Sequence, residues 1–228
     1  MHAKHADDKS KTWRVLIVDD HPLVQTGLTS LIDAEPDLEV CGQTGSISEA
    51  LELVRTAKPD LAIVDLSLAD GNGLTLVKRL RSGHSGVRAL VCSMHDEALF
   101  AYRALKAGAM GYIGKEEATT RVVEAMRHVL DGKVWLSTNM TERVFQGLAK
   151  GIAASQSASI ESLTDRELEV FGLIGRGLGA SKIAEQLHLS VKTIETHREN
   201  IKKKLNLRSG SELTRRAMQW TLGEDESP

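Results

Sequence analysis

The stretch Val15-Leu16-Ile17-Val18-Asp19-Asp20 joins four consecutive aliphatic residues to two carboxylates. A short, continuous apolar run of this kind is typical of a strand that is buried on both faces, as in a parallel sheet. Four more such runs follow in the first half of the chain, at residues 38–41, 61–64, 88–92 and 110–113. Together with residues 14–18, they predict a sheet of five parallel strands.

Between these runs, apolar residues recur with the spacing of a helix. Helices are predicted at residues 23–34, 47–57, 74–80, 99–107 and 118–130. Strands that alternate with helices at this rhythm favour an α/β fold in which helices cover both faces of a parallel sheet. We expect this domain to span residues 13–132, which is long enough to bury a core of its own.

The composition of the 228-residue chain is that of a globular protein, with 41% hydrophobic and 26% charged residues. It excludes disordered and collagen-like classes. No apolar run approaches the roughly 18 residues of a membrane-spanning helix, and residues 1–11 lack the apolar segment of a secretory signal. Cys41 and Cys92 lie within apolar runs, which favours a reducing compartment over disulfide bonds. We therefore expect a cytoplasmic protein with no membrane partner.

Reactive and charged side chains follow four of the five predicted strands. They are Asp19 and Asp20 after the first strand, Asp65 after the third, Ser93 after the fourth and Lys115 after the fifth. Functional residues gather at the carboxyl ends of strands in parallel α/β sheets, so we expect these five to converge. Three clustered carboxylates repel one another unless a cation such as Mg2+ joins them. One carboxylate can then be the nucleophile in phosphoryl transfer, although each aspartate taken alone is more typical of a turn or a helix cap.

Residues 15–24 resemble the opening of the receiver domain of response regulators, and residues 61–66 resemble the segment that carries the phosphoacceptor of that family. The resemblance implies a flavodoxin-like fold with strand order 2-1-3-4-5, and it identifies Asp65 as the phosphoacceptor. Ser93 and Lys115 match the family's hydroxyl and lysine positions.

The same resemblance implies a metal site and a switch. The implied ligands of Mg2+ are Asp19, Asp20, Asp65 and the main-chain carbonyl of Ser67. Tyr112 matches the aromatic switch position, so phosphorylation is expected to draw Ser93 toward the phosphoryl group and let Tyr112 turn inward. One departure concerns the loop after the phosphoacceptor, where the family usually has proline and this chain has Ala69. We expect that loop to be less rigid.

The pattern changes after the predicted receiver domain. Residues 133–162 are expected to form one more helix, at 141–148, followed by a flexible linker of small and polar residues. Residues 163–223 are expected to form an all-α domain of four helices. Thr164 and Glu167 have the spacing of a capping box, Ser190 is placed to cap a further helix, and Ser209 to start the last one.

Helices predicted at 180–188 and 191–205, joined by a short turn, have the layout of a helix-turn-helix. On the second of them Ile194, Ile201 and Leu205 are expected to pack inward. Residues 192–208 carry six cationic and two anionic side chains, a formal charge of +4 in a chain whose net charge is −2. Periodicity and charge leave two interpretations open, a DNA-reading helix and an ordinary solvated helix.

Residues 163–170, 177–187 and 190–201 are similar to the LuxR-type helix-turn-helix family. Both domains together resemble a NarL/FixJ-type response regulator of a two-component system. The resemblance implies base contacts by Glu195, Thr196 and Glu199, and phosphate contacts by Lys192, Thr193, His197 and Lys203. It also implies that the helix at 211–222 takes part in a DNA-bound homodimer.

We therefore expect a transcription regulator and not an enzyme. A sensor histidine kinase would phosphorylate Asp65 and thereby switch binding to double-stranded DNA. Three alternatives remain: an aspartyl-phosphate enzyme, an interaction protein whose helical domain binds protein, and a regulator that needs no phosphorylation. Asp-based phosphatases usually have a second aspartate two residues after the nucleophile, where this chain has Ser67.

Overall fold

The computed structural model describes residues 12–83, 86–95, 97–138, 140–141 and 160–221. The chain divides into two compact units, residues 1–150 and residues 151–228. Within the described residues, no helix has both the length and the apolar character that a membrane crossing requires.

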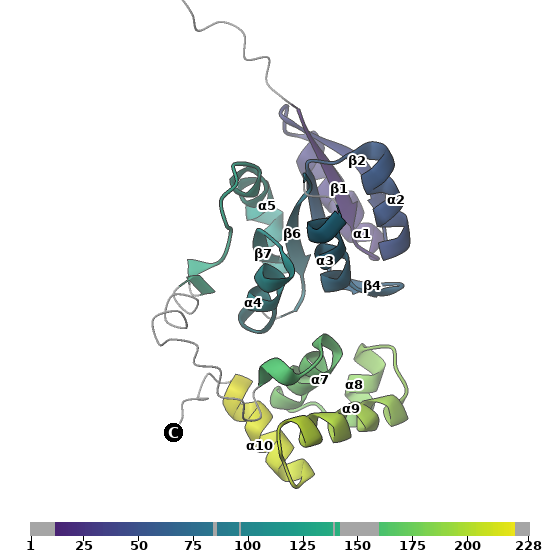
Figure 1. The fold of residues 1–228 in the computed structure, drawn as a ribbon, viewed down its shortest axis with the longest axis vertical. Helices are drawn as coiled ribbons and strands as arrows, with labels where there is room; N and C mark the ends of the chain where they lie inside the picture. Colours follow the sequence, from purple (N-terminus) through teal and green to yellow (C-terminus); the bar gives the residue numbers. More distant parts are fainter. Residues whose placement is uncertain (1–11, 84–85, 96, 139, 142–159, 222–228) are drawn as a thin grey trace, which may run out of the picture. The chain divides into compact units, whose positions relative to one another are not determined.

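The N-terminal unit is built on one parallel sheet of five strands. Its strands are β1 (Trp13–Val18), β2 (Leu38–Thr44), β3 (Leu61–Val64), β6 (Arg88–Ser93) and β7 (Gly111–Gly114), in the order β2-β1-β3-β6-β7 (Figure 1). This order confirms the predicted flavodoxin-like fold. Val18 pairs with Val64, and Val64 pairs with Val91. The carboxyl ends of these central strands therefore lie side by side.

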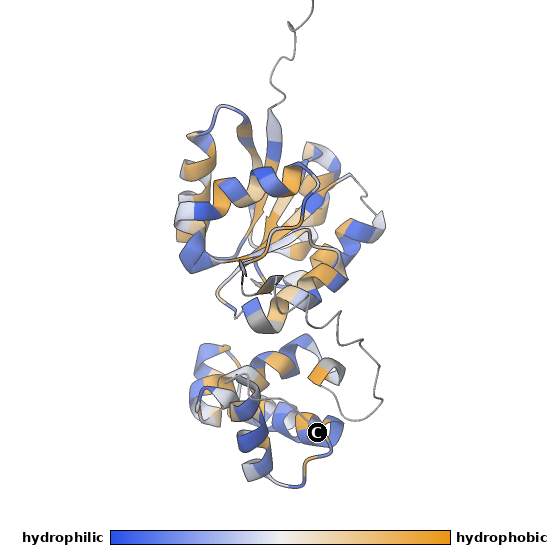
Figure 2. Ribbon diagram, turned by 90° about the vertical axis from the view of Figure 1, so that its left-hand side faces the viewer, coloured by the Kyte–Doolittle hydropathy of each residue, from blue (hydrophilic) through white to orange (hydrophobic). Residues whose placement is uncertain are grey.

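In the described part of this unit five helices cover the sheet, and all five were predicted from the sequence. They are α1 (Pro22–Asp33), α2 (Ile47–Ala57), α3 (Gly73–Gly83), α4 (Glu97–Ala107) and α5 (Lys115–Leu130). Helices α1 and α5 contact each other, as do α2 with α3 and α3 with α4, which places the two groups on opposite faces of the sheet. Figure 2 shows hydrophobic residues along the strands and hydrophilic residues on the outer sides of the helices. Helix α5 begins three residues earlier than predicted, so that Lys115 is its first residue.

A small hairpin follows β3 and was not predicted. Strands β4 (Ser67–Leu68) and β5 (Gly71–Asn72) pair antiparallel. At its tip, Asp70 caps helix α2: its Oδ1 accepts the Ile47 N–H at 2.6 Å, and its Oδ2 accepts the N–H and the hydroxyl of Ser48, both at 3.1 Å. The Ala69 N–H also donates to the carbonyl of Gly45 at 3.1 Å. The loop that lacks the family's proline is thus anchored by hydrogen bonds, while its lower rigidity stays a prediction.

Replacing Asp70 with alanine should loosen this anchor, because two amides in the first turn of α2 lose their acceptor. A lost helix cap costs about 1 kcal/mol, so the Ile47 and Ser48 amides should exchange with solvent about fivefold faster. Hydrogen exchange measured by NMR would detect this change. Asp70→Asn keeps an acceptor and should stay close to the wild-type rates; equal rates in Asp70→Ala and wild type would contradict the anchoring role.

The C-terminal unit is helical. Its described residues form a 3-10 turn, η1 (Ile160–Ser162), and helices α7 (Asp165–Gly175), α8 (Ala180–Gln186), α9 (Val191–Lys204) and α10 (Gly210–Thr221). The four α-helices confirm the predicted all-α domain, with α8 and α9 forming the helix-turn-helix. Residues 160–162, which the sequence assigned to the linker, are ordered in the 3-10 turn. The helix predicted at 141–148 falls almost wholly outside the described residues.

Local capping explains why the helices begin where the sequence predicts. Thr164 and Glu167 form the reciprocal capping box, with the Thr164 N–H donating to Glu167 Oε2 at 2.8 Å and the Glu167 N–H donating to Thr164 Oγ1 at 3.3 Å. The hydroxyl of Ser190 accepts the Thr193 N–H at 3.1 Å, and that of Ser209 accepts the Glu212 N–H at 3.1 Å. Each cap satisfies amides that have no partner within the helix.

The core of this unit lies between α7, α9 and α10. Phe171 of α7 is fully buried, as are Ile194 and Ile201 of α9 and Leu213 of α10. The inward packing predicted for Ile194, Ile201 and Leu205 is confirmed, since all three are buried. This core presents the opposite side of α9 to solvent.

Candidate functional site

The carboxyl edge of the sheet brings Asp19, Asp65 and Lys115 together. Asp19 follows β1 and Asp65 follows β3, and the two side chains are 3% exposed. The Lys115 Nζ, at the start of α5, lies 2.6 Å from Asp19 Oδ2 and 2.7 Å from Asp65 Oδ2. The ammonium therefore bridges two buried carboxylates that stand on neighbouring strands.

Main-chain contacts hold Asp65 in place. Its Oδ1 accepts the Leu66 N–H at 2.7 Å, and its own N–H donates to the Val18 carbonyl at 2.8 Å. The Gly73 N–H donates to the Leu66 carbonyl at 2.9 Å. A Cβ at Gly73 would lie 1.9 Å from the Asp65 carbonyl oxygen, so only glycine allows α3 to begin this close to the main chain of Asp65. The position of the side chain is fixed by packed backbone on both sides.

Burial and charge act on the groups of this pocket in opposite directions. Burial raises the pKa of Asp19, and its hydrogen bond from Lys115 only partly offsets that effect. Burial alone would lower the pKa of Lys115, but the charges of Asp65 and Asp19 outweigh it and raise that pKa. The lysine thus stays charged, and with the carboxylates ionised one ammonium faces more than one negative charge.

Asp20 and His21 complete an oxygen-rich cluster with these carboxylates. One potential ligand atom from each of Asp19, Asp20, His21 and Asp65 lies within 4.8 Å of the others. His21 Nδ1 lies 2.7 Å from Asp20 Oδ1, and the main-chain N–H of His21 donates to Asp19 Oδ1 at 2.9 Å. Carboxylate oxygens are the ligands that hard divalent cations prefer, so this donor set fits a divalent metal ion. Ser67, whose carbonyl is the further predicted ligand, lies on β4, and its role stays a prediction.

Ser93 and Tyr112 lie on the neighbouring strands β6 and β7, both fully buried. Ser93 is hydrogen-bonded to His95, with 2.9 Å between its Oγ and the His95 Nδ1. The Tyr112 hydroxyl donates to the His95 carbonyl at 2.7 Å. The sequence predicts that Tyr112 turns inward upon phosphorylation, but the ring is already inward here. His95 was missed by sequence reasoning, although its position two residues after Ser93 was a usable signal.

Helix α9 exposes most of the side chains predicted to meet DNA. Lys192, Glu195, Thr196, Glu199 and Lys203 are exposed, whereas Thr193 and His197 are half-buried. The two glutamates are paired within the helix, Glu195 with Arg198 at 3.5 Å and Glu199 with Lys202 at 2.7 Å. These pairs reduce the repulsion between the glutamates and a phosphate backbone.

His197 differs from the other predicted contacts. Its Nδ1 is buried and has no hydrogen-bond partner among the described residues. Burial lowers the pKa of His197, and the nearby positive charge of Arg166 on α7 adds to that effect. Its ring is therefore neutral at pH 7, so a phosphate contact by His197 would lack a full positive charge.

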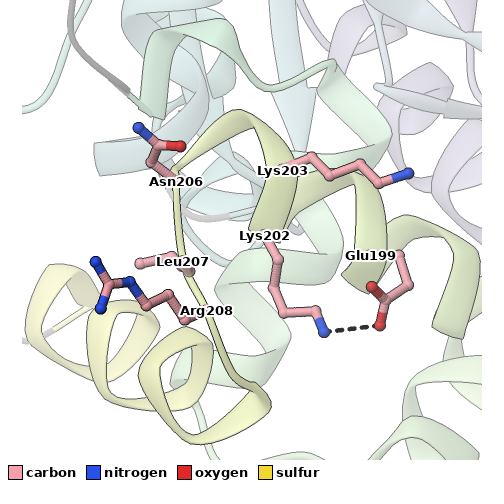
Figure 3. A pocket seen from close by; sticks show the side chains of 6 residues that line it. All are labelled: Glu199, Lys202, Lys203, Asn206, Leu207 and Arg208. Atoms are coloured by element: carbon pink, nitrogen blue, oxygen red, sulfur yellow. Dashed lines mark ion pairs between the residues drawn. The ribbon is translucent and has the colours of Figure 1, made fainter.

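A hollow lies at the C-terminal end of α9. Its volume is about 390 Å³, and it is lined by Glu199, Lys202, Lys203, Asn206, Leu207 and Arg208. Figure 3 shows the Lys202 side chain directed at Glu199, while Lys203 and Arg208 extend separately. Lys203 and Arg208 therefore take no part in the ion pair between Lys202 and Glu199. Arg208 was counted in the charge of the region but was not predicted as a contact.

One ion pair fixes this end of α9 against α7. The Lys204 Nζ lies 2.6 Å from Glu167 Oε2, and the Glu167 side chain is 5% exposed. Burial alone would raise the pKa of Glu167, but Lys204 and the amide and hydroxyl of Thr164 outweigh it and lower that pKa. Glu167 therefore serves the capping box of α7 and the anchoring of α9 at once.

Comparison with known proteins agrees with both halves of this geometry. Residues 15–127 match the family of response regulator receiver domains, and residues 161–217 match the bacterial regulatory proteins of the luxR family. The oxygen regulatory protein NreC of Staphylococcus epidermidis is 34% identical over 217 residues, covering 92% of this chain and 99% of that protein. The NreC of Staphylococcus carnosus is 32% identical, with 92% and 98% covered. The chain is a LuxR-type response regulator.

Solved structures support the same assignment. A LuxR-family two-component response regulator from Aurantimonas sp. SI85-9A1 is 30% identical, with a TM-score of 0.56, and covers 61% of this chain and 99% of its own. RcsB from Salmonella enterica serovar Typhimurium, bound to promoter rprA in the presence of phosphomimetic BeF3-, has a TM-score of 0.59 at 22% identity, with 91% and 99% covered. The latter likeness shows the fold.

Membership in the LuxR-type response regulators defines the function in outline. The chain is a transcription regulator of a two-component system, with a histidine kinase as phosphodonor and DNA as target. Its acidic cluster lies where receiver domains bind a divalent metal ion.

Replacing Glu167 with glutamine should destabilise the helical domain by about 1–2 kcal/mol at pH 7, because a charge-assisted hydrogen bond becomes a neutral one. The folded-state pKa of Glu167 is lowered, so its contribution is present above the unfolded value near 4.5 and is lost as pH falls through the folded value. Calorimetry of the full chain should therefore show a difference between variant and wild type that shrinks in acid. Glu185→Gln, at an exposed position of α8, serves as control; a difference that persists at low pH would contradict the assignment.

Proposed function

We propose that Asp65 is the phosphoacceptor of this response regulator and that Mg2+ is the metal ion of its acidic cluster. The observation that supports this proposal is the Lys115 ammonium, which contacts Asp65 and Asp19 at 2.7 and 2.6 Å. A carboxylate beside a fixed positive charge, at the edge where the central strands end, has what phosphoryl transfer requires.

The transfer follows from these positions. An oxygen of Asp65 attacks the phosphorus of a phosphohistidine on the kinase; a P–O bond forms while the P–N bond breaks, and its electron pair returns to the imidazole nitrogen. Lys115 would offset charge on the phosphoryl oxygens, and Ser93 would donate its hydroxyl proton to them. Mg2+, held by Asp19, Asp20, Asp65 and the Ser67 carbonyl, would supply further positive charge. The acyl phosphate adds negative charge beside Lys115, which biases the residues around Ser93 and Tyr112.

The output is proposed to be DNA binding by a homodimer. Residues 13–132 form the receiver domain, residues 133–162 connect it, and residues 163–223 read DNA in the cytoplasm. Two copies of α9 would read two half-sites about one helical turn apart, with α10 taking part in the dimer contact. Phosphorylation would shift the population of chains that can pair in this way.

An Asp65→Asn variant should take up no phosphoryl group from acetyl phosphate and Mg2+, because an amide cannot act as the nucleophile. Intact-protein mass spectrometry should show one added phosphoryl group on the wild type and none on the variant. Asp131→Asn, at an exposed aspartate of the same unit, should behave as wild type. Equal labelling of Asp65→Asn would show that the acceptor lies elsewhere, and turnover of an external phosphoester would favour the enzyme alternative.

For the helical domain we propose that Glu195, Thr196 and Glu199 face the bases and that Lys192, Thr193, His197 and Lys203 face the phosphates. Glutamate can accept from cytosine N4, and the methyl group of threonine can contact that of thymine. The Thr196 hydroxyl donates to the Lys192 carbonyl at 3.0 Å, so its hydrogen is already engaged. We add Arg208, because it lines the cationic hollow beside Lys203.

Removing one phosphate-contacting cation should make DNA binding less dependent on salt. Each such contact releases counterions, so Lys203→Ala and Arg208→Ala should each lower the slope of log K against log salt by about 1. Fluorescence anisotropy with a labelled random-sequence duplex would measure this slope. Lys78→Ala removes the same charge from α3 in the other unit and should leave the slope unchanged; an unchanged slope in Lys203→Ala and Arg208→Ala would exclude these contacts.

A further inference from the structure

The Ser93 hydroxyl is engaged by a residue that the receiver chemistry does not use. Ser93 is fully buried at the end of β6. Its Oγ lies 2.9 Å from the Nδ1 of His95 and also accepts the His95 N–H at 3.3 Å. A hydroxyl has a single proton to donate. When that proton is directed at Nδ1, it is not available to any other acceptor.

Two buried rings fix the position of His95. The imidazole meets Phe100 edge to face, with 4.8 Å between ring centroids and an interplanar angle of 71°. The His95 carbonyl accepts the Tyr112 hydroxyl at 2.7 Å. Phe100 on α4 and Tyr112 on β7 are 2% and 1% exposed. His95 is therefore held from two elements, its imidazole by Phe100 and its main chain by Tyr112.

We propose that His95 is a positioning residue whose Nδ1 accepts the proton of the Ser93 hydroxyl and so keeps that proton from other acceptors. A phosphoryl group on Asp65 must then compete with the imidazole for the hydroxyl proton. This inference rests on the proposed capture of a phosphoryl group by Asp65. Breaking the Ser93–His95 hydrogen bond would weaken the binding of the phosphoryl group. The stronger this hydrogen bond is, the larger that loss of binding free energy would be.

The two roles of His95 are carried by different atoms. Its side chain contacts Ser93, whereas its main-chain carbonyl anchors Tyr112. A substitution of the side chain therefore removes the competitor for the hydroxyl and leaves the acceptor of Tyr112 in the chain. This separation makes the proposal testable by mutation.

The test is binding of beryllium trifluoride, a phosphoryl mimic, to the full chain in the presence of Mg2+, followed by ¹⁹F NMR and calorimetry. His95→Phe keeps an aromatic ring beside Phe100 but cannot accept the hydroxyl proton. Because a neutral hydrogen bond is worth about 0.5–1.5 kcal/mol, this variant should bind the mimic about two- to twelvefold more tightly than wild type. His95→Leu, which also lacks an acceptor, should give a gain in the same range. His95→Asn, which can accept near the place of Nδ1, should return toward wild type.

The decisive comparison uses the same substitutions in a Ser93→Ala background, where no hydroxyl is left to release. The gain from His95→Phe should vanish there, since a double-mutant cycle isolates the pair. A gain that persists without Ser93 would assign the effect to packing and overturn the proposal. Unchanged or weaker binding by both His95→Phe and His95→Leu would also overturn it. Failure of the wild type to bind the mimic would instead contradict the proposed phosphoryl site, and the inference with it.

Discussion

The contact of the Lys115 ammonium with Asp19 and Asp65 is the interaction on which the receiver half depends. Two carboxylates buried at the ends of neighbouring strands repel each other, and one cation at 2.6 and 2.7 Å offsets that repulsion. The strand order brings the carboxylates side by side, and the early start of α5 brings the lysine to them. When both carboxylates are ionised, one ammonium offsets only part of their negative charge. The same arrangement therefore favours binding of a further cation.

What the sequence predicts well is what depends on local or periodic signals. The five apolar runs predict the strands, and the residues after them predict the pocket, because parallel strands end at a common edge. The Thr164–Glu167 box likewise predicts the start of α7 from residues three apart. The anchoring of the loop after Asp65 could not be predicted, because Asp70 bonds to Ile47 and Ser48, more than twenty residues earlier in the chain. Such a contact leaves no periodic trace in the sequence.

The charge of the recognition helix shows a similar limit. The formal charge of +4 over residues 192–208 counts every charged side chain fully, whether or not it forms an ion pair. In the structure, Lys202 and Arg198 are paired with the glutamates of the same helix, and Lys204 is paired with buried Glu167. The cations at the end of α9 that these pairs leave out are Lys203 and Arg208. With Lys192 at the other end of the helix, the cations outside these pairs flank the middle of the exposed face, where the proposed base-reading residues lie.

In the receiver pocket, Tyr112 and Ser93 both contact His95, but they contact different atoms of it. Tyr112 lies inward in this structure, with its hydroxyl donating to the carbonyl of His95. The Ser93 hydroxyl, in contrast, is hydrogen-bonded to the His95 side chain. A phosphoryl group that draws Ser93 away removes one of the contacts that hold the His95 imidazole, while the Tyr112 anchor on the carbonyl of the same residue remains. The response to phosphorylation would then begin at the residues around His95 and α4, and the switch role of Tyr112 stays a prediction.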